Sequence, residues 1–135
     1  AFSNSMVGMV HALAHACGGV CHVPHGIANA ILLPHGLEFN IQSIPRPIAE
    51  LSGMLGGSIE FMEEKEQAMV TVSLVKNLLG RLNRISGLPV RLRDAGVAED
   101  KLPAIASAAI NDGALAFNPV EVSYDEALEV LKKAY

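Results

Sequence analysis

Four histidines lie within fifteen residues of the chain: His11, His15, His22 and His25. His11 and His15 are four residues apart, so on a helix they would share one face. His25 follows the break at Gly18-Gly19, which assigns it to the next structural element. Two packed helices can direct imidazoles into one cleft, and helical domains build metal sites in this way. The spacing therefore leaves a metal site held by His11 and His25 as one of two open interpretations of this cluster.

His15 allows a different role. It would face the same way as His11 but about 6 Å further along the helix, beside a metal rather than on it. An imidazole with an ordinary pKa of about 6.5 suits proton transfer or a substrate contact there. The alternative for each histidine is a hydrogen-bonded core residue. Several buried imidazoles need partners, because an unpaired polar group costs about 1–3 kcal/mol, and a cation supplies one.

Two cysteines, Cys17 and Cys21, lie beside His22 and leave a structural zinc site open as an alternative. Their C-x3-C spacing straddles an expected helix end and does not match the usual zinc knuckle. Four residues apart on a helix, they are also poorly placed for a disulfide, and we expect reduced thiols. His22 and His35 are expected at the surface or partly buried.

Composition indicates one domain over residues 1–135, because the chain is half hydrophobic and long enough for a core. A net charge of -4, with no basic block and few aromatic residues, argues against nucleic-acid binding. No apolar run approaches the roughly 18 residues of a membrane helix. The first residues lack the basic region of a signal peptide, and we expect a cytoplasmic protein.

The elements that position these histidines are expected to be helices, as is the rest of the chain, because no segment shows the alternation of apolar and polar residues that is typical of a strand. Apolar residues recur at helical spacing in six segments: 3–17, 24–33 with a further turn to 40, 48–55, 63–85, 102–111, and 123–135. Gly18-Gly19 should end the first helix and Pro34 should kink or end the second. Ser123 and Glu126 form a capping-box pattern that opens the last one. The predicted fold is an all-α helical bundle.

Several motifs in residues 4–40 resemble the signature of the group III, iron-containing alcohol dehydrogenases. They are V-H-A-L-A-H at 10–15, Gly18-Gly19, P-H-G at 24–26, A-N-A at 28–30, L-L-P at 32–34 and F-N at 39–40. The segment N-D-G-A-L-A-F-N-P at 111–119 is similar to the end of those enzymes. Dehydroquinate synthases and glycerol dehydrogenases share the architecture but differ around the second metal histidine, so the alcohol dehydrogenase branch is preferred.

The resemblance implies that this chain is the C-terminal, all-helical, metal-binding domain, without its first helices. The family's N-terminal α/β domain, which binds NAD(P) through a glycine-rich loop, has no counterpart here. The family's upstream D-x3-H segment, which supplies two further metal ligands, has no counterpart here either. His11 and His25 match the family's last two ligands for Fe2+ or Zn2+. His15 matches a histidine placed between the metal and the nicotinamide. We expect the chain to be a piece of a longer protein.

The function that the resemblance implies is that of a dehydrogenase or reductase. The chain would be the metal-binding half of an NAD(P)-dependent alcohol dehydrogenase or aldehyde reductase. The metal acts as a Lewis acid on the oxygen of a short-chain alcohol or aldehyde while hydride is transferred. Alone, the chain is expected to be inactive. Family members are often dimers or larger, which leaves a homo-oligomer open. A non-catalytic helical interaction module and a structural zinc-binding domain remain as alternatives.

Overall fold

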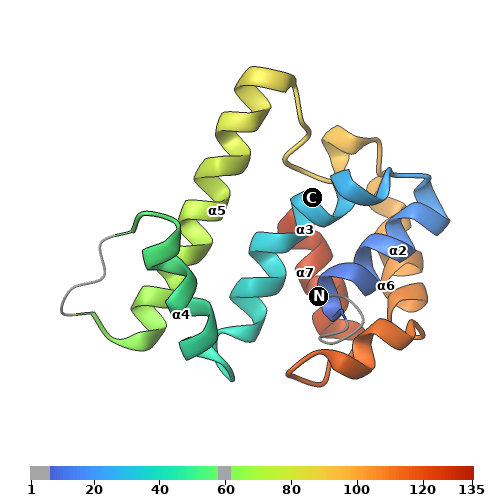
Figure 1. The fold of residues 1–135 in the computed structure, drawn as a ribbon. Coiled ribbons are helices and arrows are strands. Elements are labelled where there is room, and N and C mark those ends of the chain that lie inside the picture. Colours follow the sequence, from blue (N-terminus) through green and yellow to red (C-terminus); the bar gives the residue numbers. More distant parts are fainter. Residues whose placement is uncertain (1–6, 58–61) are drawn as a thin grey trace.

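The computed structural model describes residues 7–57 and 62–135, and all regular structure in those ranges is helical (Figure 1). The α-helices are α2 (Met9–Cys21), α3 (His25–Asn40), α4 (Pro45–Met54), α5 (Glu64–Ser86), α6 (Leu102–Ala109) and α7 (Tyr124–Ala134). Short 3-10 turns are η1 (Arg93–Ala95), η2 (Glu99–Lys101) and η3 (Gly113–Phe117). The predicted all-α fold is confirmed.

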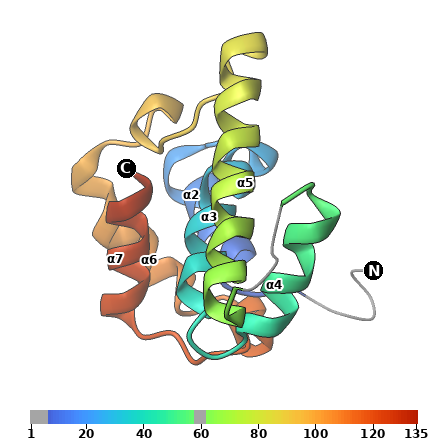
Figure 2. The same ribbon diagram turned by 90° about the vertical axis from the view of Figure 1, so that its left-hand side faces the viewer.

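Helix α3 lies at the centre and contacts α2, α5 and α7. Figures 1 and 2 show α4 and α5 on one side of α3, with α2, α6 and α7 on the other. The larger core joins α2, α3, α6 and α7 through fully buried residues such as Leu13, Ile31 and Leu131. A smaller cluster around Ile48 and Val72 packs α4 against α5. The pair α2 and α3 carries the histidines.

The first described helix begins later than its periodicity predicted. Residues 7 and 8 are not helical, and residues 3–6 of the predicted helix lie outside the described ranges. Helix α2 starts at Met9, whose N–H donates to the side-chain Oδ1 of Asn118 at 3.1 Å. A Cβ added at Gly8 would lie 2.8 Å from that same oxygen. A distant side chain therefore caps the helix, and only glycine leaves it room.

The prediction that Gly18-Gly19 ends this helix is wrong. Helix α2 continues to Cys21, and its C-cap is His22, which has a left-handed backbone with φ of 57°. The N–H of His22 donates to the carbonyl of Gly18 at 3.0 Å. Two glycines cost a helix only about 1 kcal/mol each relative to alanine, and burial of Cys17 and its neighbours in the core offsets that cost.

Helix α3 passes through Pro34 without ending and runs to Asn40. Proline normally costs a helix interior about 3 kcal/mol, but Pro34 is buried here, in a helix packed on three sides. Local signals elsewhere were reliable. The capping box at Ser123 and Glu126 opens α7 as predicted. Helix α5 ends at Ser86, one residue after the predicted end, and its C-cap is Gly87, with φ of 72°.

Helix α5 leaves the core along its second half. Leu78, Leu82 and Ile85 belong to its apolar stripe, yet all three are exposed. The buried part of its apolar face lies in the first half of α5, around Val72.

Within the described residues, no helix combines the length and apolar character needed to cross a bilayer.

Candidate metal centre

Three imidazoles meet where α2 packs against the start of α3. The ring centroids of His11 and His25 are 5.4 Å apart, and those of His15 and His25 are 5.0 Å apart. His11 and His15, one turn apart on α2, have ring centroids separated by 6.1 Å. The structure thus brings together the three histidines singled out in the sequence, while their roles as ligands or proton carriers stay predictions.

A hollow of about 500 Å³ opens beside this cluster. Its lining residues are Val10, His11, His25, Gly26, Asn29, Ala30 and Leu33. Apolar side chains from both α2 and α3 form its walls, and two imidazoles lie at one edge. His15 is not among the lining residues but stacks on His25 at an interplanar angle of 18°. The hollow has the apolar walls and few polar groups typical of a small-molecule site.

The electrostatics of His11 suit metal binding. Burial lowers the pKa of the His11 imidazole, and the neighbouring His25 and His15 rings lower it further. The ring therefore stays neutral to a lower pH than a free imidazole. A metal binds only the neutral form, through a nitrogen lone pair, so the environment of His11 keeps that lone pair available.

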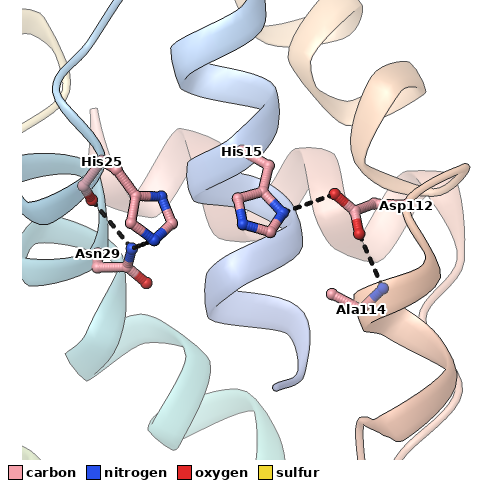
Figure 3. Close-up of polar contacts among 5 residues, drawn as sticks. All are labelled: His15, His25, Asn29, Asp112 and Ala114. Atoms are coloured by element: carbon pink, nitrogen blue, oxygen red, sulfur yellow. Dashed lines mark hydrogen bonds and ion pairs between the residues drawn. The ribbon is translucent and has the colours of Figure 1, made fainter. Parts of the chain in front are cut away.

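His25 is oriented by Asn29, four residues along the same helix. The amide Nδ2 of Asn29 donates to the Nε2 of His25 and to the backbone oxygen of His25, both at 2.9 Å (Figure 3). The other end of the amide, Asn29 Oδ1, is buried and has no hydrogen-bond partner in the structure. A buried acceptor left unpaired next to the hollow fits a ligand hydroxyl or a cation placed there.

The residues present fit a metal such as Fe2+ or Zn2+, since imidazole nitrogens are ligands of both. Within residues 7–57 and 62–135, however, no group of three or more His, Cys, Asp or Glu side chains is arranged to hold an ion. His11 and His25 would therefore supply part of a coordination shell, with His25 Nε2 exchanging the hydrogen bond from Asn29 for the ion.

On the far side of His15 lies an acidic residue that sequence reasoning did not single out. The Nδ1 of His15 is 2.8 Å from Asp112 Oδ2, and Asp112 Oδ1 accepts the N–H of Ala114 at 2.8 Å (Figure 3). Partial burial acts to raise the pKa of Asp112, but the hydrogen bonds from Ala114 and His15 outweigh it, and the pKa is lowered. The carboxyl is therefore an acceptor at neutral pH.

The cysteines do not resemble a zinc site. Both are free thiols, and Cys17 is fully buried. Burial, with a smaller contribution from Cys21, raises the pKa of the Cys17 thiol to about 12. Since thiolate is the metal-binding form, this environment disfavours the structural zinc alternative. His22 is exposed and His35 partly buried, as expected.

Two site residues were missed in the sequence, Asn29 and Asp112, and each left a readable signal. Asn29 follows His25 at the four-residue spacing that places side chains together on a helix. Asp112 follows a predicted helix and precedes Gly113, a typical position for a side chain that caps the next turn. That Asp112 reaches His15 had no signal, because the two are 97 residues apart.

The fold and the site together define an all-helical domain with an imidazole cluster between two packed helices. Residues 1–135 match the model of the Fe-containing alcohol dehydrogenase family, C-terminal, and the chain therefore belongs to that family. The resemblance seen in the sequence is confirmed.

Named relatives agree with this assignment. The chain is 34% identical to the 1,3-propanediol dehydrogenase of Citrobacter freundii, covering 100% of this chain and 34% of the relative. It is 36% identical to the lactaldehyde reductase of Escherichia coli strain K12, covering 99% and 34%. A crystal structure of 1,3-propanediol oxidoreductase, 34% identical, superposes with a TM-score of 0.89 over 99% of this chain and 34% of that one. The chain thus spans about a third of the length of these relatives.

Proposed function

We propose that this chain is the metal-binding part of an NAD(P)-dependent alcohol dehydrogenase or aldehyde reductase, with His11 and His25 as ligands. The observation that carries the proposal is the pair of rings 5.4 Å apart at the edge of the apolar hollow. Family membership supports the same reaction class, and two relatives are named for reactions of a diol and a hydroxyaldehyde.

When bound, Fe2+ or Zn2+ would supply Lewis-acid chemistry to a substrate oxygen. The chain's own residues would hold and orient the reactants. His11 and His25 bind the ion, and the walls at Val10, Ala30 and Leu33 accept the short carbon chain of an alcohol or aldehyde. His15, one turn from His11, exchanges the hydroxyl proton. The nicotinamide cofactor would lie near His15 and be bound mainly by other parts of the longer protein.

Metal titration tests the ligand assignment directly. Co(II), followed by its visible absorption, should bind the wild-type protein weakly, and binding should fall below about pH 6 as imidazoles protonate. Either His11→Ala or His25→Ala should lower the affinity at least about tenfold, because losing even a group that only orients a ligand costs about that much. His22→Asn is the matched control, since His22 is exposed and asparagine tolerates its left-handed backbone. Equal affinities for all four proteins would refute the assignment.

The 135-residue chain alone should show no turnover. Two imidazoles give an incomplete coordination shell, so neither substrate nor cofactor would be held in line. The assay supplies NADH or NADPH with an aldehyde, or the oxidised cofactors with propanol, and added Fe(II). Activity well above that of His11→Ala would contradict this. Cytoplasmic location and assembly into a homo-oligomer also stay predictions, the latter checked by sedimentation velocity.

A further inference from the structure

Asp112 links the imidazole cluster to a distant part of the chain. It lies at the N-cap of η3, while His15 lies in the middle of α2. One carboxylate oxygen contacts His15 Nδ1 at 2.8 Å and the other accepts the Ala114 N–H at 2.8 Å. With both oxygens engaged, the carboxylate has little freedom to rotate, so the direction in which it meets the imidazole is set by η3.

This contact decides which nitrogen of His15 carries the hydrogen. A carboxylate only accepts hydrogen bonds, so the nitrogen facing it must be N–H. Nδ1 therefore donates to Asp112, and Nε2 of the neutral ring keeps its lone pair. Figure 3 shows this second nitrogen on the side of the ring that faces His25. Stacking of the His15 and His25 rings, with centroids 5.0 Å apart, further restricts rotation.

We propose that Asp112 is a positioning residue that holds His15 in the tautomer whose Nε2 accepts the substrate's hydroxyl proton. The inference rests on the proposed function, which makes His15 the proton carrier. In alcohol oxidation the O–H bond breaks and an N–H bond forms at Nε2, while hydride passes from carbon to NAD(P)+. The products are an aldehyde or ketone, NAD(P)H and an imidazolium that Asp112 stabilises. Aldehyde reduction reverses each transfer.

A purely structural role for Asp112 predicts something different. As a cap, Asp112 needs only one oxygen for the Ala114 N–H. Asp112→Asn separates the two roles. Its Oδ1 can still accept from Ala114, but an amide NH2 replaces the oxygen that faces His15. That NH2 donates, so His15 must accept through Nδ1 and carry its hydrogen on Nε2. The hydrogen bond that caps η3 is therefore kept, while the hydrogen of the neutral His15 ring moves from Nδ1 to Nε2.

Nitrogen-15 NMR of the histidine-labelled protein reads the tautomer without metal or cofactor. Spectra are recorded at about pH 8.5, two units above the usual imidazole pKa, and His15→Gln assigns the signal. We expect a protonated Nδ1 in the wild type and a protonated Nε2 in Asp112→Asn. Asp125→Asn, a change at an exposed acid in the first turn of α7, should leave the tautomer unchanged. A protonated Nε2 in the wild type overturns the proposal, even if the variant fails to fold.

Kinetics of the complete enzyme supply the functional readout. Asp112→Asn should lower kcat at least tenfold with KM for the alcohol nearly unchanged; the same change at a serine-protease aspartate costs about 10⁴ in kcat through the wrong tautomer. Unchanged kcat would overturn the positioning role. Co(II) affinity should match the wild type, because Asp112 does not contact His11 or His25. Metal binding should be lost only in the His11 and His25 variants. Co(II) affinity therefore tests the proposed function, while the tautomer and kcat of Asp112→Asn test the positioning role.

Discussion

Asn118 is predicted to stabilise the fold through contacts with three separate segments. Its Oδ1 accepts from the Met9 N–H at 3.1 Å and from Asn40 Nδ2 at 3.3 Å. Its Nδ2 donates to Asn40 Oδ1 at 3.0 Å and to the Val120 carbonyl at 2.8 Å. The side chain therefore joins the start of α2, the end of α3 and the segment after η3, and α2 carries His11 two residues beyond the capped N–H.

The magnitude follows from what Asn118→Ala leaves unpaired. Each hydrogen bond contributes about 0.5–1.5 kcal/mol net, and a buried group stranded without a partner costs about 1–3 kcal/mol. Asn40 is buried, so its amide loses partners that water replaces poorly. Asn118 itself is partly exposed, which lets water reach some of the vacated positions. The expected loss in the free energy of unfolding is about 2–4 kcal/mol.

Urea unfolding followed by circular dichroism measures this loss. Asn118→Asp should lose less than Asn118→Ala, because a carboxylate still accepts from Met9 and favours the helix N-terminus. Asn111→Ala is the matched control: Asn111 is exposed and its side chain donates a hydrogen bond to the carbonyl of Ser107, so its effect should stay within about 0.5 kcal/mol. If Asn118→Ala costs no more than this control, the structural reasoning is wrong.

Three further outcomes are expected. Gly36→Ala should cost about 1–3 kcal/mol in urea unfolding, because the new Cβ would overlap the Cγ2 methyl of Val10, and adding Val10→Ala should recover most of the loss. At about pH 8, a thiol reagent should modify Cys21 in the native protein while Cys17 stays protected until the protein unfolds, because burial raises the pKa of Cys17 to about 12. Equal modification rates for the two thiols in the native protein would contradict this. Burial lowers the pKa of His35, so the unfolded chain binds more protons there, and stability should fall as pH drops below about 6.5. His35→Gln should flatten that decline, and an unchanged slope would contradict the assignment.

Much of the helical fold was predictable because its signals are local. The Ser123 and Glu126 capping box, the long periodic run of α5 and the Gly87 stop each involve residues within a turn or two of one another. The errors arose where distant contacts competed with local propensity. Gly18-Gly19 would end an isolated helix, but in the folded chain neighbouring residues are buried in the core, and α2 continues to Cys21.

For the candidate site, the sequence alone determined that His11 and His15 share a helix face and that His25 opens the next helix. Both follow from spacing and from the residues that start and stop helices. Only the tertiary structure decided that the three rings meet, that Asn118 sets where α2 begins, and that Asp112 holds His15. The latter two contacts join residues 109 and 97 positions apart. Local backbone geometry cannot predict contacts between residues so far apart in the sequence. These groups come within hydrogen-bonding distance only because α2, α3 and η3 pack together in the folded chain.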